Sequence, residues 1–237
     1  MDRSFYRVGG AAAVVGGILG LVGNLLAPRW TNINDVDRYR KIADSGIWRA
    51  DGIILVFAII LITAGTVAVA RSLEGGGVDG LAVFGRLAAV VGASLALLDF
   101  GVTTYAVKEQ ATAFAGATGA QQVPAFWATN GLDHFLTALF NTWSIVLLGV
   151  APLLLGLAVL RTRRYPTWLG WAAVVGGIVC VATGTVGLLR SDQDPLVIPF
   201  VIGSVLVTIW GLGAGWLLWQ RSGTSPATPA QQAARAA

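Results

Sequence analysis

The sequence predicts an all-α protein, a polytopic membrane bundle with six transmembrane helices. Of its 237 residues, 55% are apolar and 12% are charged, whereas an ordinary soluble domain carries about 25% charged residues. Five stretches of 19 to 26 residues contain no Asp, Glu, Lys, Arg or His, and about 20 mostly apolar residues can cross a bilayer. The alternating segments of about ten residues that are typical of membrane β-barrels are absent.

The uncharged stretches are 8–28, 52–70, 135–160, 165–189 and 195–220, and a sixth apolar stretch, 81–107, is interrupted by Arg86 and Asp99. The first stretch is too long for a signal-peptide core and is not followed by a small-residue cleavage site. Residues 1–220 are therefore predicted to form one bundle, and residues 221–237 a disordered tail rich in Ser, Thr, Pro, Ala and Gln. We expect membrane helices at 8–27, 50–70, 82–106, 132–160, 168–189 and 196–219.

Lys and Arg favour one side of this predicted bundle by a small margin. With a cytoplasmic amino terminus, nine of them lie inside and seven outside. Five of the outer seven fall in the 28–49 loop among three aspartates, whereas Arg161, Arg163 and Arg164 concentrate positive charge in one inner turn. The positive-inside tendency therefore predicts that both termini are cytoplasmic.

The 28–49 loop also has apolar residues near helical spacing. This spacing fits a short interfacial helix and fits an ordinary polar loop equally well. The residues concerned are Ile33, Val36, Arg40, Ala43 and Ile47.

The single histidine and the single cysteine exclude several kinds of site. One chain with only His134 and Cys180 cannot form an internal disulfide, a Cys/His zinc site or a bis-histidine haem site. The net charge is +4, but the basic residues are scattered between apolar stretches and form no nucleic-acid-binding stripe. Phosphate-binding loops, nucleophile elbows and zinc-protease motifs are also absent. We therefore expect no metal, no cofactor and no nucleic-acid partner.

Small residues recur at intervals of four along three of the predicted helices. Lipid provides no hydrophobic drive between helices, so close contact through small residues is important. We interpret these faces as packing seams inside one monomer, and a homodimer interface is the alternative. They comprise Ala12, Gly16, Gly20 and Asn24; Ala172, Gly176, Cys180 and Gly184; and Gly203, Gly211 and Gly215.

Polar residues inside the membrane helices are the best functional indicators, because an intramembrane charge costs about 2.5–3.5 kcal/mol on insertion scales. Arg86 can extend to the membrane surface. Asp99 has a short side chain, so it needs a partner, a proton or water, and Thr103 lies one turn later. Asp99 is therefore a candidate functional acid, with a structural, hydrogen-bonded carboxylate as the alternative.

The helix predicted at 132–160 carries a polar stripe at steps of three and four residues. This stripe can line a ligand cavity or only join helices by hydrogen bonds. Spacing alone leaves open whether Asp133 or His134 belongs to it, and His134 beside an aspartate is a candidate proton-transfer pair or a structural residue. The stripe comprises Asn130, Asp133 or His134, Thr137, Asn141 and Ser144, with Trp143 close by.

Acidic residues gather on the predicted outer side, which suggests that any site opens away from the cytoplasm. No comparable acidic set lies on the inner half. The alternative is that acidic residues simply collect where basic ones do not. The outer acidic residues are Asp51, Asp99, Asp133, Asp192 and Asp194, and His134 lies on the same side.

Residues 154–177, LLGLAVLRTRRYPTWLGWAAVVGG, join a helix with a basic end to a helix that starts Pro-x-Trp-Leu-Gly. This element, and the stretch 42–71 in which Trp48-Arg49-Ala50-Asp51 leads into the second membrane helix, resemble small bacterial membrane proteins of the DUF4386 family. The resemblance covers most of the six-helix plan and implies the fold and a bacterial origin, but no activity. Abundant Ala, Gly, Val and Arg with little Lys also suggest a GC-rich bacterium. We expect the protein in the bacterial cytoplasmic membrane.

Three functions remain open at this point. The first is a non-catalytic module, in contact with the lipid bilayer, that binds a lipid or apolar small molecule in an outward-opening pocket or serves as an accessory subunit. The second is an intramembrane enzyme acting on a lipid or isoprenoid, with Asp99 and Asp133 or His134 as acid and base. The third, a proton-coupled transporter, is least favoured because no clear inverted repeat or broken helix is present. Residues expected around the ligand are Asp51, Thr103, Asn130, Thr137, Asn141 and Trp143.

Overall fold

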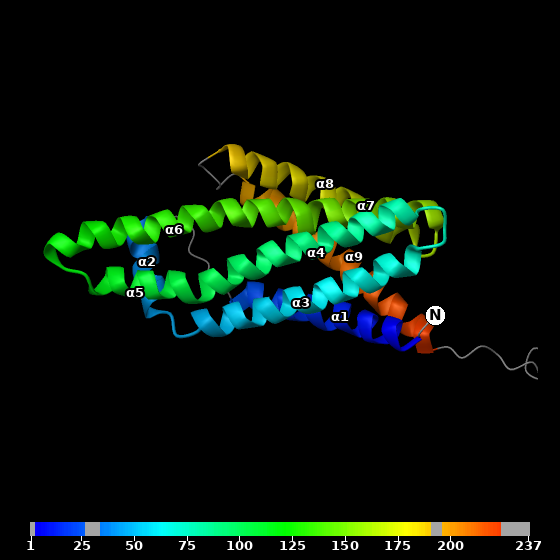
Figure 1. Cartoon of the computed structure of the whole chain (residues 1–237), viewed down its shortest axis with the longest axis horizontal. Helices are drawn as coiled ribbons and strands as arrows, with labels where there is room; N and C mark the ends of the chain where they lie inside the picture. The colour runs from blue at the N-terminus through cyan, green and yellow to red at the C-terminus, as the bar shows by residue number, and fades with distance from the viewer. Residues whose placement is uncertain (1–2, 27–33, 191–195, 224–237) are drawn as a thin grey trace, which may run out of the picture.

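The computed structural model describes residues 3–26, 34–190 and 196–223 (Figure 1). These residues form helices and turns and include no strand. The longer helices are α1 (Arg3–Leu26), α3 (Trp48–Leu73), α4 (Asp79–Val102), α6 (Gln122–Trp143), α7 (Ala151–Thr162), α8 (Thr167–Leu189) and α9 (Val197–Gly223). The shorter ones are α2 (Asp35–Asp44), α5 (Lys108–Gly116), the π-helical segments η1 (Thr103–Val107) and η3 (Ser144–Val150), and the 3₁₀ turn η2 (Gly119–Gln121).

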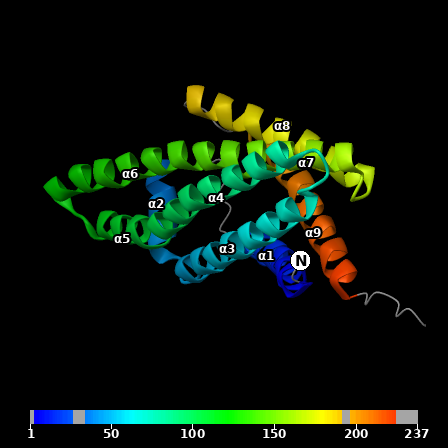
Figure 2. The ribbon, with the colours of Figure 1, turned by 45° about the vertical axis from the view of Figure 1, so that its right-hand side comes forward.

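Among the described residues, six helices are long and apolar enough to cross a membrane, which confirms the predicted six-span, all-α plan. Four of them are α1, α3, α8 and α9. The other two are composite, because α4, η1 and α5 form one span of 38 residues and η2, α6, η3 and α7 form one of 44. The start of α1 and the end of α9 lie at the same end of the bundle (Figures 1 and 2).

The two composite helices extend further than the sequence predicts. At 1.5 Å per residue they are about 57 and 66 Å long, whereas the hydrocarbon core is about 30 Å thick. The sequence prediction ended one helix at 106 and began the next at 132, but the helices continue to Gly116 and from Gln122. An uncharged stretch marks only the part of a helix that lies in hydrocarbon. It does not indicate the helical turns that project beyond the membrane.

These projecting turns form a small helical unit with α2 at the end of the bundle opposite the start of α1 and the end of α9 (Figure 1). We call α2, α5 and residues 122–136 of α6 the α2 cap. Its core is built from side chains of all three elements, and Tyr39 and Ile42 on α2 are fully buried. A short helix, one of the two alternatives for the 28–49 loop, is therefore present, but its buried face differs from the predicted one. Arg40 and Ile47 of the predicted face are exposed, and Ile33 lies outside the described residues. The core residues are Tyr39, Ile42, Val107, Ala111, Phe114 and Leu136.

Polar groups hold both ends of α2. At its start, the Asn34 side chain accepts a hydrogen bond from the Asp37 backbone amide at 2.9 Å, as an N-cap residue does. At its end, Lys108 Nζ on α5 donates to the carbonyls of Ile42, Ala43 and Ser45 at 2.7, 2.6 and 2.9 Å. A cation favours the C-terminal end of a helix, so Lys108 fastens α2 onto α5.

Several glycines of the predicted seams face other helices of the same chain. A Cβ atom on Gly16 of α1 would lie 2.6 Å from the Ile62 amide nitrogen of α3, and one on Gly176 of α8 would lie 2.9 Å from the Gly203 carbonyl oxygen of α9. Larger residues at these positions would separate the helices. These glycines have packing partners within the monomer, whereas a Cβ atom on Gly211 would meet nothing within 4 Å.

Candidate functional site

Asp99 and Trp143 form a buried hydrogen bond between α4 and α6. Asp99 is 5% exposed and Trp143 is 4% exposed. Trp143 Nε1 donates to Asp99 Oδ2 at 2.7 Å, and Thr103 Oγ1 donates to Asp99 Oδ1 at 3.4 Å. The first contact is a normal hydrogen bond and the second is long. No Lys, Arg or His of the described residues forms an ion pair with Asp99. Because its contact with Thr103 is long, the Oδ1 atom can accept another hydrogen bond.

Asp99 lies in the wall of an open pocket of about 220 Å³ beneath the α2 cap. Helices α4 and α6 provide most of the wall, α3 provides Trp48 and α2 provides Arg38. Most of the other lining residues are apolar or aromatic. The polar groups of the wall come from a few side chains, as in many ligand sites. The lining residues are Arg38, Trp48, Asp99, Phe100, Thr103, Val107, Asp133, Leu136, Thr137 and Phe140.

An ion pair between Arg38 on α2 and Asp133 on α6 lies at the same pocket. The Nη2–Oδ1 distance is 2.5 Å, and the two side chains are 38% and 16% exposed. A pair exposed to this degree contributes about 1 kcal/mol or less to stability. Its structural effect is to hold α2 against α6, while it leaves Asp99 as the pocket carboxylate without a cationic partner.

Both π-helical segments lie next to the Asp99–Trp143 hydrogen bond. Segment η1 begins at Thr103, one turn after Asp99, and η3 begins at Ser144, directly after Trp143. A π-helix disturbs the regular i to i−4 bonding, and such segments often occur at functional sites. Near η1, Trp48 Nε1 donates to the Thr103 carbonyl oxygen at 3.0 Å, which joins the start of α3 to this part of the pocket.

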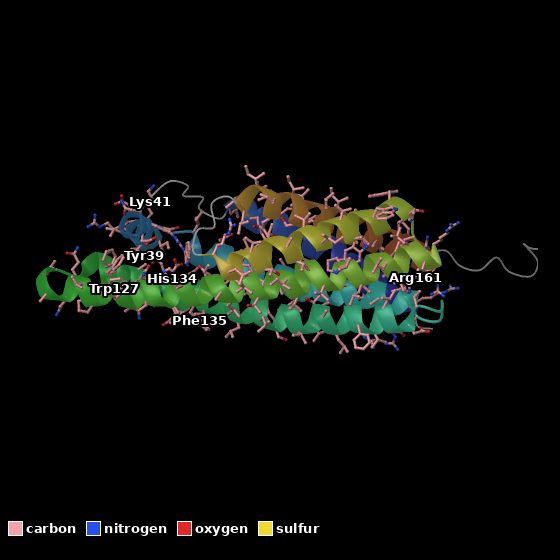
Figure 3. The ribbon with its side chains drawn as sticks, turned by 90° about the horizontal axis from the view of Figure 1, so that it is seen from above. Tyr39, Lys41, Trp127, His134, Phe135 and Arg161 are labelled. Carbon is pink, nitrogen blue, oxygen red and sulfur yellow. The ribbon has the colours of Figure 1, made fainter. Side chains whose placement is uncertain are left out.

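The structure shows which of Asp133 and His134 lies at the pocket. Asp133 lines the pocket together with Asp99. His134 is exposed and is not among the lining residues. Figure 3 shows His134 on α6 in the region of the α2 cap, at the opposite end of the bundle from Arg161. The pocket therefore brings together two carboxylates and not a carboxylate and the histidine.

Asn130 and Asn141, also expected around the ligand, lie outside the pocket. The Tyr39 hydroxyl donates to Asn130 Oδ1 at 3.0 Å, so Asn130 belongs to the α2 cap. Burial raises the pKa of the Tyr39 phenol and the charge of Asp133 raises it further, which keeps this donor protonated. Asn141 Nδ2 donates to the Thr137 carbonyl at 2.9 Å, and its amide lies against Gly187 of α8.

Asp51 is buried separately from the pocket. Its side chain on α3 is 8% exposed, and its Oδ1 atom has no hydrogen-bond partner among the described residues. It is not among the pocket-lining residues. Asp192 and Asp194 lie outside the described residues.

Several pocket residues were not predicted from the sequence. Five basic residues occur in the 28–49 loop, and their spacing does not show that Arg38 is the one that reaches Asp133. Phe100 and Phe140 resemble any other apolar residue of a membrane helix. Within the described part of the chain, no three His, Cys, Asp or Glu side chains lie close enough together to hold a metal ion.

Comparison with known proteins gives a family and no named relative. No curated protein and no solved structure matches the chain. The family model of DUF4386, a domain of unknown function, matches residues 8–218, from the first turns of α1 to near the end of α9. Because this match covers most of the chain and includes every pocket residue, the protein belongs to the DUF4386 family.

Proposed function

We propose that the protein binds an amphiphilic molecule, a lipid or an apolar small molecule with a polar group, in the pocket beneath the α2 cap. The observation that carries this proposal is the position of Asp99. A buried carboxylate is costly in a membrane helix, and this one is kept in a pocket wall by a tryptophan donor.

The chemistry of the wall fits such a ligand. Asp99 Oδ1 has only the long contact from Thr103, so a ligand hydroxyl or amine can donate to it. Trp48, Phe100 and Phe140 offer aromatic surface for a hydrocarbon chain or ring. Binding would give the carboxylate a strong, charge-assisted partner, while the apolar part of the ligand leaves water or lipid for the aromatic wall.

The pocket opening is proposed to face the extracytoplasmic side of a bacterial cytoplasmic membrane. Tyr39 of the α2 cap lies at the opposite end of the bundle from Arg161 (Figure 3), and Arg38 and Asp133 of the cap line the pocket. We call the end with Arg161, where α1 starts and α9 ends, the terminal end (Figure 1). Arg161 and Arg163 are exposed at the terminal end, which favours a cytoplasmic location for that end. A ligand would then enter from the outer leaflet or from the aqueous space beneath the cap.

A second function, an intramembrane enzyme, is favoured by one observation. Asp99 and Asp133 line the same pocket, and two carboxylates in different environments are a common acid–base pair. Asp99 accepts hydrogen bonds from the neutral side chains of Trp143 and Thr103, whereas Asp133 is paired with Arg38. In this alternative, Asp99 is the proton donor and Asp133 the base for a lipid or isoprenoid substrate.

Blocking the pocket without touching Asp99 tests the binding function. Thr137→Phe adds a ring to the pocket wall, and Thr142→Phe makes the same change on the same helix outside the pocket. Native mass spectrometry of the full chain released from mild detergent should show a bound small molecule in the wild type and in Thr142→Phe. The molecule should be missing in Thr137→Phe. Equal occupancy in both variants would contradict the proposal.

Asp99→Asn separates the two functions. The amide keeps the shape of the carboxylate, and its oxygen can still accept from Trp143, but it cannot transfer a proton at this position. A binding module should retain the co-purified molecule in this variant. An enzyme should retain it and lose turnover of it to a modified product. The products are measured by mass spectrometry of lipid extracts incubated with each variant.

A further inference from the structure

The start of α1 and the end of α9 lie at the same end of the bundle (Figures 1 and 2), and residues of both helices line a second groove there. The two helices approach closely because Gly10 has no side chain, since a Cβ there would lie 2.7 Å from both the Gly215 carbonyl oxygen and the Trp219 amide nitrogen. Arg7 lies one turn before Gly10 on the same face of α1. It lines a groove of about 410 Å³ with Trp216, Trp219 and Gln220.

Three other arginines near this end have a partner within the chain, whereas Arg7, like Arg161 and Arg163, has none among the described residues. Arg86 pairs with Glu74, Arg164 donates to the carbonyls of Ser72 and Glu74, and Arg71 lies 5.2 Å from the centre of the Phe5 ring. Within the described part of the chain, Arg7 has no ion pair, hydrogen bond or ring contact. An exposed guanidinium beside apolar rings is a ready partner for a planar or tetrahedral anion.

The aromatic residues of the groove place it at the depth of lipid headgroups. Trp216 and Trp219 are 46% and 37% exposed, and their rings meet edge to face with centroids 5.1 Å apart. Tryptophan concentrates at the boundary between hydrocarbon and headgroups. Arg7 lies within the first two turns of α1, and both tryptophans lie near the end of α9, so the groove spans this boundary.

We propose that this groove binds the headgroup of an anionic phospholipid in the leaflet at the terminal end, independently of the pocket at Asp99. The lipid phosphate pairs with the Arg7 guanidinium, and the Gln220 amide donates to a second headgroup oxygen. The two indoles contact the glycerol and the first carbons of the acyl chains. A phospholipid is favoured over a soluble anion because two of the four lining residues are tryptophans, and a free phosphate would leave their indoles in contact with water.

Lipid retention in detergent tests the proposal with matched arginine variants of the full chain. Arg7→Gln removes the proposed phosphate partner, Arg7→Lys keeps its charge, and Arg161→Gln removes one charge from the same end outside the groove. Each variant is incubated with equal amounts of phosphatidylglycerol and phosphatidylcholine, and the bound lipids are counted by native mass spectrometry. A parallel sample contains inorganic phosphate in excess. Circular dichroism checks that every variant is folded.

The wild type should retain phosphatidylglycerol in preference to phosphatidylcholine. Arg7→Gln should lower this preference about fivefold, the effect expected for one arginine at an anionic lipid surface. Arg7→Lys and Arg161→Gln should stay within about twofold of the wild type, and inorganic phosphate should not compete. Three results would overturn the proposal: an unchanged preference in Arg7→Gln, an equal loss in Arg161→Gln, or displacement of the lipid by inorganic phosphate.

Discussion

Trp143 Nε1 donates to Asp99 Oδ2 at 2.7 Å, and this contact joins α4 and α6 just before each helix becomes π-helical. The bond gives the buried carboxylate its one short contact from a donor side chain among the described residues. It also fixes the position of Asp99 in the pocket wall. The geometry of the pocket wall around Asp99 therefore depends on this pair.

Replacing Trp143 with Phe should destabilise the protein by about 1–3 kcal/mol, because a buried carboxylate oxygen loses its donor. Chemical unfolding in detergent micelles, followed by circular dichroism, measures the change. Trp168→Phe is the matched control, since Trp168 is 57% exposed on α8, and it should change stability by less than about 0.5 kcal/mol.

The same substitution in an Asp99→Leu background isolates the hydrogen bond. When the acceptor is already apolar, Trp143→Phe should cost less than it does in the wild type, because no oxygen is then left without a donor. Equal costs in the two backgrounds would show that the Trp143 indole acts only by packing.

Lys108→Met should release α2 from the rest of the α2 cap. The substitution removes the donor to three carbonyls at the end of α2 and keeps most of the side-chain volume. Hydrogen–deuterium exchange should become faster in residues 35–44 while α8 stays protected. Lys41→Met, an exposed position on α2, is the control, and equal exchange in the two variants would argue against this role of Lys108.

Two glycines should respond in opposite ways to alanine. A Cβ on Gly65 of α3 would lie 2.4 Å from Ala13 Cβ and 2.6 Å from Ala13 Cα, whereas one on Gly101 of α4 would meet nothing within 4 Å. Gly65→Ala should lower the melting temperature because α1 and α3 must separate. Gly101→Ala should leave it unchanged or raise it, since alanine favours the helix by up to about 1 kcal/mol. A similar effect at both sites would mean that α1 and α3 do not pack as described.

Cysteine labelling tests on which side the α2 cap lies. In a Cys180→Ala background, Lys41→Cys and Arg161→Cys place one exposed thiol at each end of the bundle (Figure 3). The proposed orientation predicts that a membrane-impermeant maleimide labels the Lys41→Cys variant in intact spheroplasts and labels the Arg161→Cys variant only after lysis. The reverse pattern would place the pocket opening in the cytoplasm.

The membrane spans could be predicted from the sequence, while the α2 cap could not. Uncharged stretches longer than a bilayer leave few alternatives to a spanning helix. The segment that includes Lys108, Glu109 and Gln122 gives no such signal, because its helices are stabilised by contacts with α2. Those contacts depend on tertiary structure.

The polar stripe of α6 was predicted as one face, but its residues diverge around the helix. At 3.6 residues per turn, Asn141 is rotated by about 80° to one side of Asp133 and Trp143 by about 80° to the other. Asn141 consequently faces Gly187 of α8, and Trp143 reaches Asp99. The two successive steps of four residues from Asp133 to Asn141 turn the stripe away from the pocket, so its members cannot all face one cavity.

Photo-crosslinking from the pocket wall is the most direct test of the central claim that a ligand binds beside Asp99. A photoreactive phenylalanine analogue replaces Phe140, which already places a ring in the pocket wall, or the exposed Phe135 as the control, in the full chain in native membranes. We expect one defined small-molecule adduct from position 140, weakened by Asp99→Leu, and a different or mixed set of lipid adducts from position 135. The same adducts from both positions, unaffected by Asp99→Leu, would contradict this claim.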